Sequence, residues 1–474
     1  MAKSSRAFLS VSSLVLLGLA VARPASASGF QLRDQSGSGQ GSAYAGVSAG
    51  GSDISTMFFN PATLTRYEGN QLQFGLTEIV PSAKFNGGAA SRSVTGTPIF
   101  GATATGNVAR SATLPTFYAL WSLDQDLKLG LSVNVPFGLT TEYDPAWAGR
   151  YHAIKSHLET LDITPTVAYR MDPKWSVGAA FVARRAKAEL STGLDVGYQG
   201  AALLNKLSVA NPGFVPGGQD GTLDVNGSSW AYGYKLGLTY DPAATVHLGL
   251  GYQSSVRETL KGTATFTIPG SVAGLIGSVA GSGATGRFAA TAMANAATSG
   301  SVSAVVDLPA TLSLGLIWDL SGTFSLAAEI AQTKWSCFKE LRIKFSNPAA
   351  QPDAFTTENW KDSMFYAVGA TCRPGGAWTY RAGLALDRSP VPDATRTPRI
   401  PDADRTWASA GVSCQVTKAF GLDAGYSHLF CKNSTVNLQG GTDSTAQTQF
   451  FAGNLSGTYK NSIDILAVQA RYSF

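Results

Sequence analysis

Apolar side chains recur at every second position in many short segments of this chain. The clearest segment is the last one, where five apolar residues alternate with polar neighbours: Leu466, Val468, Ala470, Tyr472 and Phe474. A period of two places the apolar set on one face of a β-strand. A soluble sheet ending in this way would expose a sticky edge, whereas a membrane barrel closes the edge and turns the apolar face to lipid. The ending therefore predicts the closing strand of a transmembrane β-barrel, with Tyr472 and Phe474 as its assembly signal.

The same alternation flanks six short turns, most of which contain Gly, Pro or Asp: 124–126, 172–174, 241–243, 321–322, 374–376 and 417–419. Each turn joins two strands of a hairpin. The first strand, about 71–85, and the C-terminal strand complete the set. The pattern predicts an all-β antiparallel barrel of about 14 strands, with both chain ends on the short-turn side and long loops outside.

Aromatic residues lie near the ends of these segments, where a membrane interface favours them: Trp121, Trp175, Tyr240, Trp318 and Trp378. The other faces of the strands carry small residues such as Gly237, Gly249, Gly251 and Gly315. A secreted β-sandwich or propeller is the alternative, but it would turn polar residues outward. The apolar outward faces favour the barrel.

The first 27 residues have the three parts of a secretory signal peptide. Lys3 and Arg6 begin the segment, a short apolar run follows, and Ala25-Ser26-Ala27 fits a cleavage site. No later segment has about 18 uncharged apolar residues in a row, which excludes an inner-membrane helical protein. Export followed by a β pattern indicates the outer membrane of a Gram-negative bacterium.

Composition agrees with this interpretation. Only 14% of residues are charged, and the 36 basic and 31 acidic residues nearly balance, so nothing favours a nucleic-acid partner. The four cysteines are not expected at matching heights on adjacent strands, which predicts free thiols. The four histidines (His152, His157, His247 and His428) have neither metal-site spacing nor a nucleophile motif nearby. We expect no enzyme, no cofactor and no metal.

The segment 28–69 is rich in Gly and Ser and is too long for a simple lead-in to the first strand. A wide barrel has room inside for such a segment. We therefore expect three parts: a signal peptide (1–27), an N-terminal hatch in the lumen (28–69) and the barrel with long extracellular loops (70–474).

Several ordered blocks carry a family resemblance. SGFQLRDQSGSGQGSAYAG (28–46) and FFNPATLTRYEGNQLQFG (58–75) resemble the hatch of the FadL/TodX family of outer-membrane transporters for hydrophobic compounds. Asn60, Pro61 and Ala62 match the hatch motif of that family. Further similar blocks lie at 135–151, 333–345, 359–370 and 381–407. The resemblance implies a 14-stranded barrel that takes up long-chain fatty acids or related compounds passively, through capture at extracellular loops, hatch movement and lateral exit at a kinked third strand.

The third strand ends in a sequence that fits such a kink. After the alternating positions 127–135, the chain reads Pro136-Phe137-Gly138, directly beyond Asn134. Proline lacks the N–H that a sheet needs, and glycine permits a bulge. The sequence predicts a lateral-opening kink here, and an ordinary loop entrance is the alternative.

Two loop segments have apolar stripes that could form a capture groove. One lies at 201–214 and the other, with helical spacing, at 272–279. Their apolar residues are Leu203, Leu204, Leu207, Phe214, Val272, Leu275, Ile276 and Val279. The alternative is that the two stripes simply pack on each other over the barrel mouth.

Three cations, Arg184, Lys235 and Arg381, fall on the expected lumen face and could contact a fatty-acid carboxylate. Ion pairs with lumen carboxylates such as Glu329, Asp387 and Asp423 are the alternative. The block Pro401–Arg405 is expected to tie an outer loop or bind lipopolysaccharide.

The expected partners are a hydrophobic small molecule, outer-membrane lipid and lipopolysaccharide, and the barrel-assembly machinery, with the chain a monomer. A hydrophilic porin and an adhesin-like structural barrel remain rival functions. The sequence does not distinguish a fatty acid from an alkane or an aromatic hydrocarbon.

Overall fold

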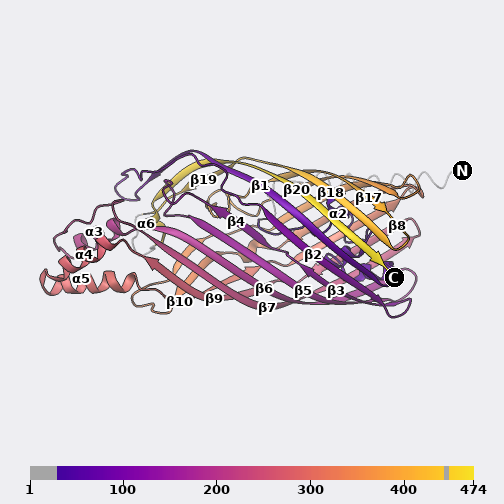
Figure 1. Ribbon diagram of the computed structural model, residues 1–474, viewed down its shortest axis with the longest axis horizontal. Coiled ribbons are helices and arrows are strands. Elements are labelled where there is room, and N and C mark those ends of the chain that lie inside the picture. The colour runs from indigo at the N-terminus through magenta and orange to yellow at the C-terminus, as the bar shows by residue number, and fades with distance from the viewer. Residues whose placement is uncertain (1–28, 442–447) are drawn as a thin grey trace.

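The computed structural model describes residues 29–441 and 448–474, and these form one closed antiparallel β-barrel (Figure 1). The expected signal peptide, residues 1–27, lies outside the described residues. The wall has 14 strands, as predicted. They follow in the order β1 (Gln71–Ser91), β2 (Ala112–Ser122), β3 (Leu127–Asn134), β5 (Lys155–Arg170), β6 (Trp175–Asp195), β7 (Asp220–Ala243), β8 (Val246–Gln253), β11 (Thr311–Asp319), β12 (Phe324–Thr333), β15 (Ser363–Cys372), β16 (Trp378–Asp387), β17 (Arg405–Gln415), β18 (Phe420–Cys431) and β20 (Asn454–Ser473). Antiparallel pairing of β1 with β20 closes the ring.

Shorter strands extend the wall on the loop side. They are β4 (Gly138–Glu142), β9 (Val256–Thr267), β10 (Gly300–Leu308), β13 (Glu340–Phe345), β14 (Ala354–Thr357) and β19 (Ser434–Leu438). The strand β9 pairs with β7 and with β10, and β10 pairs with β13. On the loop side, the wall therefore continues as one sheet beyond the ends of β8, β11 and β12.

The two ends of the barrel differ in the way that the turn pattern predicts. The helices α3 (Val196–Lys206), α4 (Gly270–Ala280) and α5 (Gly283–Ala296) lie at one end, and the C-terminus lies at the other (Figure 1). Every one of the six predicted short turns joins consecutive wall strands, at the C-terminal end. Among the described residues, no helix is long and apolar enough to cross a bilayer.

The outward face is apolar over the middle of the wall. On β7, exposed Trp230, Tyr232, Tyr234 and Leu236 alternate with residues that face the lumen. Near the short-turn end, Trp175 stacks on Tyr240 at a ring-centroid distance of 4.2 Å. Two of the aromatic residues predicted near the strand ends thus stack on each other across adjacent strands.

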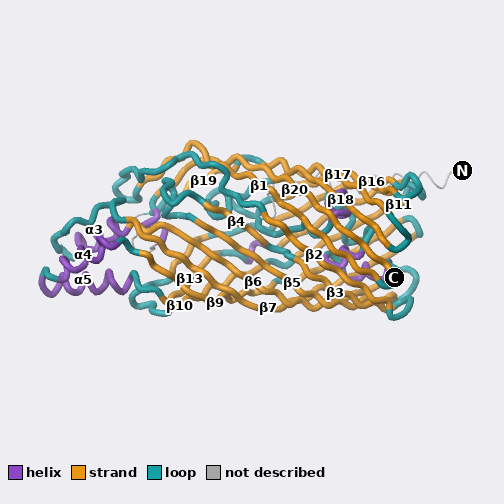
Figure 2. The backbone as a smooth tube through the Cα atoms, in the orientation of Figure 1, coloured by secondary structure: helices purple, strands orange, loops and turns teal. Residues whose placement is uncertain are grey.

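Residues 29–69 lie inside the barrel as a hatch, with short helices α2 (Gly37–Gly41), η1 (Ile54–Phe58) and η2 (Pro61–Arg66) (Figure 2). Glycines in the wall allow the hatch backbone to come close. A Cβ atom on Gly178 would lie 2.8 Å from the Cβ of Pro61, and one on Gly237 would lie 2.8 Å from the amide nitrogen of Ala62. A side chain at either position would displace the hatch.

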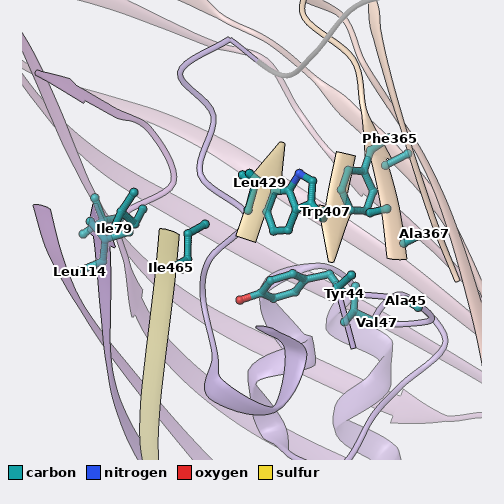
Figure 3. Close-up of a cluster of buried hydrophobic side chains, with 14 residues drawn as sticks. Tyr44, Ala45, Val47, Ile79, Leu114, Phe365, Ala367, Trp407, Leu429 and Ile465 are labelled. Atoms are coloured by element: carbon teal, nitrogen blue, oxygen red, sulfur yellow. The ribbon is translucent and has the colours of Figure 1, made fainter. Parts of the chain in front are cut away.

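Aromatic packing fixes the hatch from a second direction. Tyr44 of the hatch lies against Trp407 of the wall at a ring-centroid distance of 6.5 Å (Figure 3), and Phe365 packs on the same tryptophan at 5.9 Å. The tyrosine is fully buried, and its hydroxyl donates to the Ser36 carbonyl at 3.1 Å. Tyr44 is therefore buried between hatch and wall as a core residue would be.

Candidate ligand cavity and its gate

An apolar cavity of about 840 Å³ lies in the loop-side half of the barrel, between the wall and the start of the hatch. This figure includes the part of the space that is open to solvent. Most of its lining is aliphatic or aromatic and comes from the hatch, seven strands and two loops: Phe30, Leu139, Leu158, Leu190, Val225, Leu260, Val306, Phe338, Leu341 and Ile400. The lining can remove an extended hydrocarbon chain from water.

Three ionisable side chains line the same cavity: His157 of β5, and Glu358 and Arg399, which lie in loops. Nη1 of Arg399 donates to the Lys155 carbonyl and to Ser156 Oγ, each at 3.0 Å, which fixes the guanidinium at the cavity wall. The Trp360 indole N–H donates to Glu358 at 2.8 Å. The cavity therefore combines a long apolar lining with the guanidinium of Arg399, the carboxyl group of Glu358 and the imidazole of His157.

Burial changes the pKa of Glu358 and that of Arg399. The pKa of Glu358 is raised to about 8, chiefly because burial disfavours the carboxylate, although the Trp360 N–H and the Arg399 charge act in the opposite direction. Burial also lowers the pKa of Arg399, to about 10. Near neutral pH Glu358 is mostly protonated, so the charge of Arg399 is not cancelled by it.

Phe30, the first apolar residue of the hatch, lines this cavity and belongs to a cluster of aromatic rings. Its ring lies 4.7 Å from Trp335, 5.5 Å from Trp360 and 6.0 Å from Phe137, measured between centroids. Phe137 belongs to the predicted kink. The aromatic cluster thus joins the hatch, the cavity and the third strand at one point.

The third strand is interrupted at the residues named for the kink. The strand β3 ends at Asn134 and β4 begins at Gly138, so Pro136 and Phe137 interrupt the strand. The hatch pairs with this interruption from inside: Leu32 N donates to the Pro136 carbonyl at 2.8 Å, and Gly138 N donates to the Phe30 carbonyl at 3.0 Å. Hatch backbone therefore takes part in the hydrogen bonding of the break.

Side chains reinforce this contact just below the kink. Asn134 is buried, and its amide donates to Gln35 of the hatch at 3.0 Å and to the Tyr118 hydroxyl at 2.7 Å. Gln35 in turn donates to the Val135 carbonyl at 3.1 Å. A movement of the first hatch residues would have to break this network.

The hatch motif Asn60-Pro61-Ala62 lies against β6 and β7, two and three strands along the wall from β3. Asn60 caps η2: its side-chain oxygen accepts from Ala62 N at 3.0 Å, and its amide donates to the Ser48 and Leu238 carbonyls at 2.6 and 3.0 Å. Pro61 occupies the first helical position, where a missing N–H costs nothing. The motif holds the hatch to itself and to the wall at once.

The three cations proposed as carboxylate contacts all point into the lumen, as the period predicts, but each has other partners. Arg184 forms a fully buried bidentate pair with Asp162 at 2.6 and 2.7 Å. Lys235 donates to the Phe58 carbonyl at 2.8 Å, and Arg381 donates to Ser52 at 2.7 Å. Two of them thus tie the hatch to the wall. None of the three is among the residues that line the apolar cavity, and their contact with a ligand stays a prediction.

The two loop stripes pack on each other. Leu204, Phe214, Val272 and Val279 form a buried cluster, with Leu207, Leu275 and Ile276 packed against it. This is the arrangement that the alternative predicted, so capture there would require the cluster to open. Leu203 is half-buried on the same helix.

The block Pro401–Arg405 ties loops to the hatch. Asp402 accepts the Gly29 N–H at 3.1 Å and pairs with Arg405 at 2.6 Å. Asp404 pairs with Lys432 at 2.9 Å. This supports the structural interpretation of the block.

Other expectations concern metals, thiols and the terminus. Within residues 29–441 and 448–474, no group of three His, Cys, Asp or Glu side chains could hold a metal ion. The four cysteines are free thiols. His428 faces outward and lies 2.7 Å from Asp464, and Tyr472 stacks on the terminal Phe474 at 5.8 Å.

Comparison with known proteins identifies the relatives of this chain. A family model described as "Outer membrane protein transport protein (OMPP1/FadL/TodX)" matches residues 18–474. The "Long-chain fatty acid transport protein" of Salmonella typhi is 29% identical over 450 residues, covering 92% of this chain and 94% of the relative. The "47 kDa outer membrane protein" of Pasteurella multocida is 32% identical over 430 residues, covering 89% and 91%.

Solved structures give the same result. The crystal structure of a Pseudomonas aeruginosa FadL homologue superposes with a TM-score of 0.80 at 26% identity, covering 94% of this chain and all of the other. The toluene transporter TodX of Pseudomonas putida shares the fold, with a TM-score of 0.65 at 18% identity. The chain is an outer-membrane β-barrel and belongs to the OMPP1/FadL/TodX family of transport proteins.

Proposed function

We propose that this protein is a passive uptake channel for long-chain fatty acids or related hydrophobic compounds. The observation that carries the proposal is the apolar cavity of about 840 Å³ that meets both the hatch and the interrupted third strand through Phe30. The cavity offers an apolar solute an environment that it prefers to water by about 25 cal/mol for each Å² of buried surface.

The route has three steps in this proposal. A ligand first meets the loop cluster of α3 and α4, then enters the cavity, and finally leaves sideways through the gap at Pro136, Phe137 and Gly138. The last step requires Phe30 and Leu32 to move, because their backbones are hydrogen-bonded to the kink. Ligand binding beside Phe30 supplies a reason for that movement, since a chain in the cavity competes for the same contacts.

The ionisable groups favour a ligand with an anionic head over a plain hydrocarbon. Arg399 is held in place by the Lys155 carbonyl and Ser156, and a protonated Glu358 does not neutralise it. A fatty acid places its carboxylate at Arg399 and its chain along the aliphatic lining. Relatives named for long-chain fatty acid transport fit this choice, whereas relatives named for toluene transport share the fold alone.

The rival functions are less well supported. A hydrophilic porin needs an aqueous path, but the hatch packs against the wall at glycines and aromatic residues through the lumen. We infer that the protein acts as a monomer without a cofactor and catalyses no reaction, because it belongs to a family of transport proteins.

Uptake of labelled oleate and labelled hexadecane by cells that depend on this protein tests the proposal. Arg399→Leu should lower oleate uptake at a subsaturating concentration about tenfold, the usual effect of removing one charged hydrogen bond, and leave hexadecane uptake unchanged. Arg110→Leu is the matched control, since Arg110 is an exposed loop arginine that pairs with Glu142. Equal oleate uptake by the Arg399 variant and the parent would refute the carboxylate assignment. If deletion of the protein lowered the uptake of neither oleate nor hexadecane, the transport function itself would be refuted.

A further inference from the structure

Five outward-facing residues form a straight row across the upper wall, on the loop side of the apolar belt. Register fixes the row: Lys187 of β6 pairs with Ser228 of β7, and Ser228 pairs with Lys261 of β9. Ser303 of β10 pairs with Lys261 on one side and with Lys344 of β13 on the other. We call these residues the lysine row. Basic and hydroxyl side chains alternate along it, one per strand.

The lysine row faces away from the lumen. Lys187, Lys261 and Lys344 are exposed, whereas the residues beside them in each strand, such as Leu260 and Ile343, line the apolar cavity on the inside. The row and the cavity are therefore on opposite faces of the same sheet. The row has no part in the transport route described above.

The height of the row matches the outer edge of the bilayer. On β7 the outward residues are apolar from Tyr240 to Trp230, and the next outward residue is Ser228. Ten residue steps at about 3.3 Å cover ~33 Å of strand, or about 25 Å of height at the usual tilt, which is the thickness of the apolar belt of such barrels. Ser228 therefore lies where the lipid headgroups of the outer leaflet begin, and at the usual strand tilt each further strand raises or lowers the next member of the row by about 3 Å.

The charges of the row are only partly compensated. A hollow of about 810 Å³ beside it is lined by four basic residues, Lys155, Arg185, Lys187 and Lys261, and by two acidic ones, Glu189 and Asp224. Glu189 is shared by Lys155 and Lys187, at 2.7 and 2.8 Å. Among the described residues, no carboxylate lies within ion-pair distance of Lys261 or Lys344. The hollow has an excess of positive charge and hydroxyl donors.

The spacing of the lysines suits more than one phosphate. Adjacent strands are about 4.8 Å apart, so lysines on alternate strands stand about 10 Å apart. A single phosphate can contact one lysine and the serine beside it, and a second phosphate on the same molecule can reach the next lysine. Trp230 and Tyr232, directly below, present rings to the first carbons of an acyl chain.

We propose that the lysine row binds the phosphorylated glucosamine headgroup of lipid A, the anchor of lipopolysaccharide. This lipid occupies the outer leaflet, carries two phosphates on one headgroup and has acyl chains that would lie along the aromatic residues of β7. The opposite leaflet and single-phosphate lipids do not match the position and the spacing. The row then fixes the barrel in the outer leaflet on the side of β6 to β13.

Native mass spectrometry of the full-length barrel in mild detergent tests this assignment. The probes are bisphosphorylated lipid A, monophosphoryl lipid A and phosphatidylglycerol. Charge reversal of the row, Lys187→Glu with Lys261→Glu and Lys344→Glu, should weaken the lipid A adduct at least about tenfold, because each basic residue near a lipid surface contributes severalfold. The matched control reverses Lys174, Lys206 and Lys418, which lie in turns or on α3 away from the row.

Two further measurements make the test decisive. A neutral triple variant, Lys→Gln at the same three positions, should also lose lipid A binding. It separates the loss of positive charge from any effect of reversed charge on folding. The folding of every variant is checked by heat-modifiable migration on gels. Oleate uptake should be retained in both row variants, so the failure of this assignment would leave the transport function standing. Unchanged lipid A binding in both row variants, or equal binding of phosphatidylglycerol by the parent, would overturn the proposal.

Discussion

Buried charges in this protein have two different settings. Arg184 and Asp162 satisfy each other completely inside the lumen, and such a pair is costly to break because either partner alone would be an uncompensated charge. Glu358 and Arg399 lie instead beside an apolar cavity large enough for a ligand. The first setting ties the wall together, and the second leaves a charge for a molecule from outside.

The acidity of Glu358 leads to a pH-dependent prediction. Its pKa of about 8 lies above the usual 4.5 for glutamate, so the folded protein holds this proton through neutral pH. As the pH rises through about 8, Glu358 ionises and its charge opposes a bound carboxylate. Oleate affinity, measured by titration calorimetry, should therefore be higher at pH 6.5 than at pH 9 by roughly tenfold.

Glu358→Gln provides the control for this prediction. The variant keeps an amide that can accept from Trp360 but cannot ionise, so its oleate affinity should not change over the same pH range. The linked effect on folding has the same sign: between about 4.5 and 8 the unfolded chain releases this proton first, so the free energy of unfolding contributed by Glu358 falls as the pH rises. A parent with oleate affinity independent of pH would contradict the role of Glu358.

The sequence allowed some of these residues to be predicted and not others. Asn60 and Pro61 stand out because a capping residue followed by proline has a local meaning that needs no tertiary structure. Arg399 and Glu358 lie in loops without any period, and only the folded barrel brings positions so far apart into one cavity. Their aromatic neighbour Trp360 lies in the block 359–370, which carries the family resemblance, but its contact with Phe30 depends on where the hatch begins.

The interrupted third strand and the first hatch residues behave as one element. The hatch segment Phe30–Leu32 pairs with Pro136–Gly138 as a short strand would. Any lateral opening must therefore separate these two segments. The alternative, an ordinary loop entrance, does not explain why hatch backbone is hydrogen-bonded to the break.

A reversible crosslink tests this coupling. Gln31 and Phe137 are directly opposed in antiparallel pairing, a geometry in which Cα atoms stand about 5 Å apart and a disulfide can form. In a background without the four native cysteines, Gln31→Cys with Phe137→Cys should abolish oleate uptake when oxidised and restore it with a reductant. Assembly into the membrane should be unchanged, because the backbone pairing of the two positions is kept. The reduced double variant is the reference that accounts for the loss of the buried Phe137 ring.

The matched control for the crosslink uses two cysteines placed away from the proposed lateral exit. Ala382 and Ala410 are opposed on β16 and β17 and are exposed on the outer face, and their cysteine pair should leave uptake unaffected in either redox state. Uptake that continues at full rate through the oxidised Gln31–Phe137 crosslink would remove the lateral exit from the mechanism.

Periodicity predicted the wall strands well, but it predicted poorly the shorter strands that extend the wall on the loop side. The 14 spanning strands follow from alternation and turns alone. The separate strands β9 and β10 were not predicted, because their alternation continues that of β8 and β11, and only Ser254-Ser255 and Pro309-Ala310 interrupt it. The helix α5 has no clear apolar stripe in its Ala- and Gly-rich sequence, so nothing in the pattern indicated it.

Considered as a whole, the molecule is a cylinder blocked by its own first residues. The blockage depends on small contacts at many places, with glycines in the wall and capped turns in the hatch. Weakening one anchor should therefore loosen the hatch without unfolding the barrel.

Asn60→Ala is the direct test of that expectation. The change removes three hydrogen bonds of a buried amide, each worth about 1 kcal/mol, and leaves the Ser48 and Leu238 carbonyls without their donor. In planar bilayers the parent should conduct almost no steady ion current, and the variant should show frequent open events. Asn437→Ala, on the exposed strand β19, should resemble the parent. A closed Asn60 variant, or a parent with steady current, would contradict the hatch as the barrier.

The seam between β1 and β20 has a consequence for biogenesis. The segment that fills the bore is synthesised before the first strand, whereas the ring is sealed by the last residues of the chain. The early segment must therefore already rest within the curling sheet when the final strand arrives, or it would have to thread through a finished ring. Sealing is thus the late event of maturation, and defects in the final strand should trap an open, unsealed intermediate.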